Sequence, residues 1–181
     1  MKLILLNKPY NVMCQFSAHP TRETLANYLD IPNIYPAGRL DADSEGLILL
    51  TDDGKLQNKI SHPDYKQPKT YLVQVEGEVT ASALEKLRQP LNLGDFVTQP
   101  CIARHIHAPE WIWPRHPPIR ERANIPTSWL CIILSEGKNR QVRRMTAAVG
   151  LPTLRLIRTA IGGFSLETQP LLPGEWTEVS L

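Results

Sequence analysis

Between Gly38 and Thr51 the chain reads GRLDADSEGLILLT. The run from Leu47 to Leu50 is apolar throughout, which indicates a strand buried on both faces. The polar residues before it form a tight loop bounded by glycines, with Asp41 near its start. A loop beside a buried strand can hold a carboxylate rigidly and still present it to a ligand. An Asp in such a loop more often only hydrogen-bonds its own backbone, so a catalytic role for Asp41 needs support from the rest of the chain.

The remaining patterns predict an α+β protein. Apolar and alternating residues predict strands at 2–6, 69–77, 128–134, 153–161 and 176–181, and further strand within 95–107. Helices are expected after the caps Thr21 and Thr80, after an N-terminal signal at 52–54, and from about Arg140 to Val149. Strands connected by short helices in this order favour a mixed, mainly antiparallel sheet.

Length and composition set broad limits on the class of protein. The 181 residues are enough for one domain or two closely fused lobes, and 42% of them are hydrophobic. No apolar stretch reaches the length of a membrane span or a signal sequence, so we expect a cytoplasmic protein. The three cysteines, Cys14, Cys101 and Cys131, lack metal-ligand spacing and are expected to be reduced thiols, without zinc.

Charge is unevenly distributed, although the net charge is only +2. In the window 136–160 the sole acid is Glu136, and the bases are Lys138, Arg140, Arg143, Arg144, Arg155 and Arg158. A basic stretch of this kind is typical of a surface that binds a polyanion. A solvated helix face would explain the same charges equally well.

The helix expected within this window has two sides. Val142, Met145 and Val149 share one side at helical spacing and belong to the core, and the opposite side carries Arg140, Arg143 and Arg144. The loop 136–139 places backbone amides and a helix N-terminus beside these arginines. Such an arrangement favours a phosphate or carboxylate site over a merely solvated face.

Asp41 needs a cation if it acts as a nucleophile or base, because a nearby positive charge keeps a carboxylate ionised and oriented. Arg39 and Arg143 are the candidates. A metal site built from Asp41, Asp43 and either Asp52 or Asp53 is a third and weak alternative. No further ligand completes a recognisable metal-binding spacing there.

Aromatic residues at two places are candidates for contacts with nucleobases. Tyr71 opens a strand, where it could stack on a base, although such residues more often pack in the core. The stretch 104–129 is rich in Pro, Trp and Arg and contains Trp111, Trp113 and Arg115. Exposed Trp beside Arg is typical of a surface for single-stranded RNA. The alternative, which is slightly favoured, is a loop whose tryptophans pack on their own domain.

A series of short motifs runs through nearly the whole chain. They are LLNKP at 5–9, GRLD at 38–41, GLILLTDDG at 46–54, HP at 62–63, PKTY at 68–71, EGKNRQVRRM at 136–145, LIR at 156–158, IG at 161–162 and LPGEW at 172–176. In this order they resemble the RsuA/RluB/E/F family of ribosomal RNA pseudouridine synthases, and within it the large-subunit enzymes. Each motif is weak alone, but the ordered set is specific.

The resemblance implies a fold and an activity. The family fold is a mixed, mainly antiparallel sheet in two lobes, here about 1–66 and 67–181, with helices and loops flanking a central cleft. The activity isomerises a uridine of large-subunit (23S) rRNA to pseudouridine, by breaking the N-glycosidic bond and rejoining the uracil through carbon. It requires no metal or cofactor. The target base is expected to flip out of a single-stranded loop or bulge.

The resemblance also implies roles for individual residues. Asp41 matches the catalytic aspartate, Tyr71 the tyrosine that packs against the target base, and Arg143 the basic partner of the aspartate. RNA contacts are expected from Arg39, Lys69, Lys138, Arg140, Arg144, Arg158, Trp111, Trp113 and Arg115. A non-catalytic RNA-binding module on the same fold is the alternative.

The assembly expected from the same comparison is a monomer. Relatives usually carry a small S4-like RNA-binding domain before the first strand. This chain begins at that strand, so we expect the domain to be absent from it.

Overall fold

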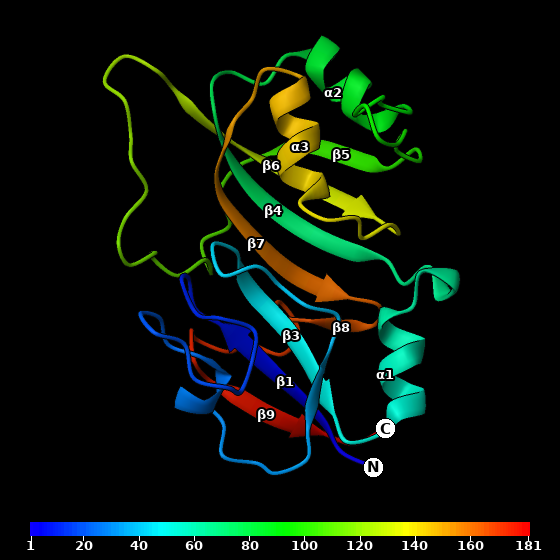
Figure 1. The fold of residues 1–181 in the computed structure, drawn as a ribbon. Coiled ribbons are helices and arrows are strands. Elements are labelled where there is room, and N and C mark those ends of the chain that lie inside the picture. The colour runs from blue at the N-terminus through cyan, green and yellow to red at the C-terminus, as the bar shows by residue number, and fades with distance from the viewer. The chain divides into compact units, whose positions relative to one another are not determined.

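The strand expected at Leu47–Leu50 is β3, Glu45–Thr51, and all of its residues are buried. It belongs to one of two units in the computed structural model, which describes all residues 1–181 (Figure 1). Unit 1 comprises Met1–Gln67 and Ile157–Leu181, and unit 2 comprises Pro68–Leu156. The sequence-based lobe 67–181 therefore includes residues 157–181, which group here with unit 1.

In unit 1, β3 is hydrogen-bonded along both of its edges. On one edge it pairs antiparallel with β1, Leu3–Lys8. On the other edge its C-terminal half pairs with β2, Tyr35–Ala37, and its first two residues pair in parallel with β7, Thr153–Ile161. Every residue of β3 is buried, so the side chains on both faces of this strand are covered, which explains the continuous apolar run.

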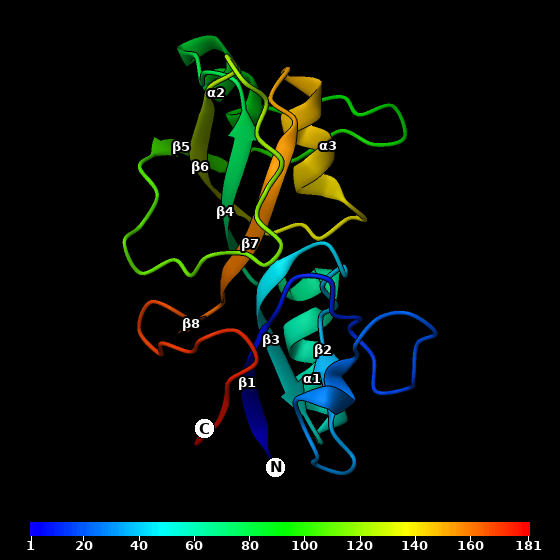
Figure 2. The same ribbon diagram turned by 90° about the vertical axis from the view of Figure 1, so that its left-hand side faces the viewer.

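Shorter elements complete unit 1. The strand β9, Trp176–Val179, pairs with β1, and β8, Phe164–Ser165, pairs with β7. The helix α1, Gly54–Ser61, begins where residues 52–54 predicted a helix start, with Asp53 as its cap, and packs beside β2 and β3 (Figure 2).

The helix expected after Thr21 is only a single 3-10 turn, Leu25–Asn27. Thr24 caps this turn in place of Thr21, and the Thr24 backbone N–H donates to the side-chain oxygen of Asn27. This reciprocal capping box satisfies the backbone at a later start than the pattern predicts.

In unit 2, the strands β4, Lys69–Glu76, β5, Ile102–Ile106, and β6, Thr127–Leu134, form a sheet in the order β5–β6–β4, followed by β7. The β4–β6 and β5–β6 pairs are antiparallel. The helices α2, Ala81–Arg88, and α3, Gln141–Ala148, pack on these strands through one shared core cluster.

The α+β class and the mainly antiparallel sheet are confirmed. Between 95 and 107 only Ile102–Ile106 is a strand. The connection from β5 to β6 is a long loop without a helix or strand (Figure 1). None of the helices combines the length and apolar character that crossing a membrane requires.

Candidate functional site

Asp41 lies in unit 1, on the loop between β2 and β3, and is exposed. The preceding Leu40 is buried in the unit 1 core, which turns Arg39 and Asp41 on either side of it outward. The backbone N–H of Ser44 donates to the carbonyl of Asp41 at 3.0 Å and closes the loop as a turn. The local sequence therefore presents the carboxylate from a closed turn anchored by Leu40.

The buried side chain of Lys8 hydrogen-bonds the backbone in the middle of this loop, at Ala42. Its side chain is 0% exposed, and its ammonium group donates to the carbonyls of Pro9 at 2.8 Å, Val12 at 2.9 Å and Ala42 at 3.3 Å. Burial lowers the pKa of Lys8 to about 8, against the opposing influence of Cys14 and the neighbouring acids, Asp41 among them. The sequence offered a signal for this role, because Lys8 ends a strand that is apolar from Leu3 to Leu6.

The side chain of Arg158 hydrogen-bonds the backbone on both sides of Asp41, at the start of the same loop and in β3. Its guanidinium donates to the carbonyls of Leu47 at 3.0 Å, Arg39 at 3.3 Å and Gly38 at 3.5 Å. The sequence predicts an RNA contact at Arg158, but the side chain is only 3% exposed. Its geometry instead favours a role in positioning the Asp41 loop.

The close pairing of β3 with β7 depends on Gly46. This residue has φ +114°, and a Cβ atom there would lie 2.2 Å from the carbonyl oxygen of Arg158. Only glycine accommodates both the conformation and the contact. The approach brings the Arg158 side chain to the loop.

The acids near Asp41 have local structural roles. Asp53 accepts hydrogen bonds from the N–H groups of Lys55 and Leu56 at the start of α1. Asp52 accepts a hydrogen bond from the Lys2 N–H at 2.7 Å, which lowers the pKa of its carboxyl group. No three His, Cys, Asp or Glu side chains lie close enough together to hold a metal ion.

Tyr71 lies on β4 in unit 2 and faces the core. It is 8% exposed, pairs with Ile132 in register, and shares a core cluster with Val142 and Met145 of α3. Most of the ring is therefore packed inside unit 2. Lys69, two residues earlier, is half-buried beside Gly137, which lies in the loop before α3.

The predicted two-sided character of α3 is confirmed. Val142 and Met145 are buried, and the opposite side opens into a hollow of about 380 Å³. The hollow is lined by Asp95, Phe96, Lys138, Asn139, Arg140, Arg143, Arg144 and Ala147. Four of the predicted site residues are therefore brought together in one place within unit 2.

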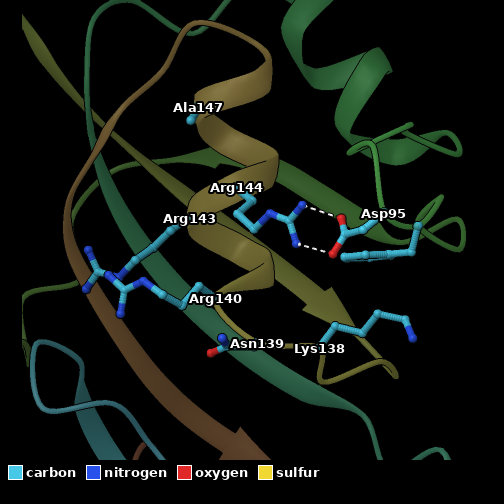
Figure 3. A pocket seen from close by; sticks show the side chains of 8 residues that line it. Asp95, Lys138, Asn139, Arg140, Arg143, Arg144 and Ala147 are labelled. Atoms are coloured by element: carbon cyan, nitrogen blue, oxygen red, sulfur yellow. Dashed lines mark hydrogen bonds and ion pairs between the residues drawn. The ribbon is translucent and has the colours of Figure 1, made fainter.

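Two arginines of the hollow point the same way and a third points elsewhere. Figure 3 shows Arg140 and Arg143 extending together, whereas Arg144 turns toward Asp95. Arg144 forms a two-pronged ion pair with Asp95, including a 3.2 Å contact from Nη1, and also donates to the carbonyl of Leu93 at 2.9 Å. This pairing lowers the pKa of the Asp95 carboxyl and raises that of Arg144. Asp95 and Phe96 carried no motif that marked them as part of the site.

The loop between β5 and β6 uses two of its three candidate residues internally. Trp113 is 7% exposed, and its carbonyl accepts a 2.7 Å hydrogen bond from Arg155. Arg115 donates to the carbonyls of Pro117, Pro118 and Leu154. These contacts favour the packed-loop alternative for Trp113 and Arg115, and leave Trp111, at 38% exposed, as the accessible aromatic residue.

Residues 2–148 match the family model described as RNA pseudouridylate synthase. The chain belongs to this family. Ribosomal large subunit pseudouridine synthase E of Vibrio vulnificus is 53% identical over 180 residues, which cover 99% of this chain and 76% of that protein. The enzyme of the same name from Xanthomonas campestris is 53% identical over 176 residues, covering 96% of this chain and 93% of its own length.

Solved structures agree with the family assignment. A pseudouridylate synthase crystal structure aligns with a TM-score of 0.78 at 28% identity, over 99% of this chain and 70% of that chain. This chain is therefore an RNA pseudouridine synthase, an isomerase, with the fold predicted from its motifs.

Proposed function

We propose that this enzyme converts a uridine of large-subunit (23S) rRNA to pseudouridine, with Asp41 as the essential carboxylate. The observation that carries the proposal is the exposure of Asp41 on a loop whose backbone is held by two buried cations, Lys8 and Arg158. A carboxylate fixed in this way keeps its reactive geometry without losing access to RNA. The names of the relatives from Vibrio and Xanthomonas support the choice of large-subunit RNA.

The reaction is a rearrangement in which no atoms are gained or lost. The bond from the ribose C1′ to uracil N1 breaks, the uracil turns, and C1′ bonds to C5, while a proton leaves C5 and N1 gains one. Asp41 acts on the nucleotide, by attack on the base or sugar or as a base toward the sugar. Tyr71 packs against the uracil, and Arg143 pairs with the aspartate.

The substrate is a uridine that leaves its stack, because a loop carboxylate cannot reach it inside a helix. An unpaired loop or bulge gives up such a base at the lowest cost.

The enzyme acts in the cytoplasm as a monomer. RNA phosphates contact the exposed cations, which position the strand without reading its sequence.

The test is Asp41→Asn, which keeps the size of the side chain and removes its charge. We expect pseudouridine formation in a large-subunit rRNA transcript to fall by at least about a thousandfold, with the RNA dissociation constant nearly unchanged. Asp43→Asn, two residues away on the same loop, is the matched control and should retain turnover. Turnover by the Asp41 variant within about tenfold of the wild type would show that another group carries the chemistry.

A further inference from the structure

Phe96 is a half-buried aromatic residue in the hollow beside α3. Its ring centroid lies 5.2 Å from the ammonium nitrogen of Lys138 and 5.2 Å from the guanidinium carbon of Arg144. An aromatic ring flanked by cations is the combination that surfaces for single-stranded nucleic acid use. The two cations differ in how firmly they are held, and that difference determines what the ring can bind.

Arg144 is fixed in place. Its guanidinium pairs with Asp95 and donates to Leu93, which ties the loop that carries Phe96 to α3. Residues Asn92 and Val97 pair across the same loop and keep it narrow. Because Asp95 compensates its charge, Arg144 serves here as a positioning residue for the ring.

Lys138 is held more loosely. It is exposed, and its contact with the Phe96 ring is of the exposed cation–π kind, which is weaker than the stacking of a nucleobase on an aromatic side chain. A base can therefore displace the ammonium group from the ring. The flexible Lys138 side chain then reaches the phosphate of the same nucleotide.

We propose that Phe96 and Lys138 form a subsite for one unpaired nucleotide of the substrate RNA, other than the target uridine. The base stacks on Phe96 and the phosphate binds Lys138, while the Asp95–Arg144 pair holds the ring in position. The subsite rests on the proposed function in that its ligand is the RNA substrate. It accepts any base, because every base offers a flat face for stacking.

The experiment measures the affinity of the full chain for an unstructured oligouridylate of about ten nucleotides, across a range of salt concentrations. Phe96→Leu keeps the apolar bulk and removes the aromatic face, and it should weaken binding about tenfold without changing the salt dependence. Phe96→Tyr should bind like the wild type. Lys138→Gln should weaken binding and reduce the slope of log affinity against log salt by about 0.7.

Lys86→Gln, which removes an exposed cation from α2, is the matched control and should leave affinity unchanged. An equal loss of oligouridylate affinity in Phe96→Leu and Phe96→Tyr would show that the ring only supports the local structure, and would overturn the subsite. Wild-type affinity in Phe96→Leu would overturn it as well.

Pseudouridine formation by the wild type is measured in parallel. Its absence would refute the proposed function, whereas the Phe96 series decides the subsite by binding alone. The two proposals therefore fail through different observations.

Discussion

The Asp41 loop of unit 1 and the hollow beside α3 in unit 2 are both rich in cations, yet use them differently. Lys8 and Arg158 are buried and donate to backbone carbonyls, so they determine the path of the chain. Lys138 and Arg140 are exposed and remain accessible to a ligand. Residue type alone therefore does not distinguish a cation that holds the backbone of a site from one that is accessible to a ligand.

The largest effect should come from Arg158→Met, which removes the guanidinium that donates to the carbonyls of Gly38, Arg39 and Leu47. We expect a loss of about 4 kcal/mol in the free energy of unfolding, because buried polar groups lose their partners. Arg158→Lys keeps the charge but not the forked geometry. It should fold with a reduced kcat and an unchanged dissociation constant for RNA.

Equilibrium unfolding, turnover and salt-dependent binding together check this prediction. If the charge-removing variant Arg158→Met still folded and its slope of log affinity against log salt became shallower by about 0.7, Arg158 would contact a phosphate. Arg158 would then belong with the cations that contact RNA and not with the buried cations that hold the loop backbone.

A smaller effect should follow from the lowered pKa of Lys8, and it depends on pH. Between its folded pKa of about 8 and its ordinary value of 10.5, the unfolded chain binds more protons at this residue than the folded protein. The free energy of unfolding of the wild type should therefore rise with pH in this window relative to Lys8→Met. The full change is about 3 kcal/mol by the relation between pKa and free energy.

Denaturant unfolding from pH 7 to 10.5 measures this difference. The exposed Lys86→Met variant should run parallel to the wild type. A constant offset between wild type and Lys8→Met at every pH would mean that Lys8 is not desolvated as the structure implies.

The smallest effect should come from Arg140→Gln, which removes one of the exposed cations of the hollow beside α3. Because Arg140 is exposed at the hollow, the free energy of unfolding should change by less than about 0.5 kcal/mol. RNA affinity should fall several-fold, and the salt slope should become shallower by about 0.7. Binding titrations at several salt concentrations, beside a melting curve, separate the two effects. An unchanged salt slope would remove Arg140 from the RNA surface.

Local patterns were sufficient to predict much of the fold. The uninterrupted apolar run predicted β3, and helical spacing predicted which side of α3 is buried. These signals work because residues close in sequence lie in the same helix or strand. The spacing of apolar residues in the sequence therefore follows the repeat of that helix or strand. The family motifs supplied the order in which the elements assemble.

The site was harder to predict, because its decisive contacts join residues far apart in sequence. Arg158 is as basic as Arg140 in the sequence, and only the pairing of β3 with β7 shows that it is buried. For Trp113 the sequence left both stacking on RNA and packing within its own loop open, and its burial in the structure favours packing. Asp95 and Phe96 gave no signal in the sequence, because what marks them is contact with residues far along the chain. Arg144 pairs with Asp95, and Lys138 lies over the Phe96 ring.

The division of β7 between the units has a consequence for the order of synthesis. Unit 2 is inserted between two segments of unit 1, and Arg158 follows Arg39 by 119 residues. A ribosome therefore releases the Asp41 loop long before the guanidinium that secures it. The Asp41 loop and Lys8 are both made early, but a nascent chain lacks the Arg158 hydrogen bonds to the loop until all of unit 2 has been synthesised.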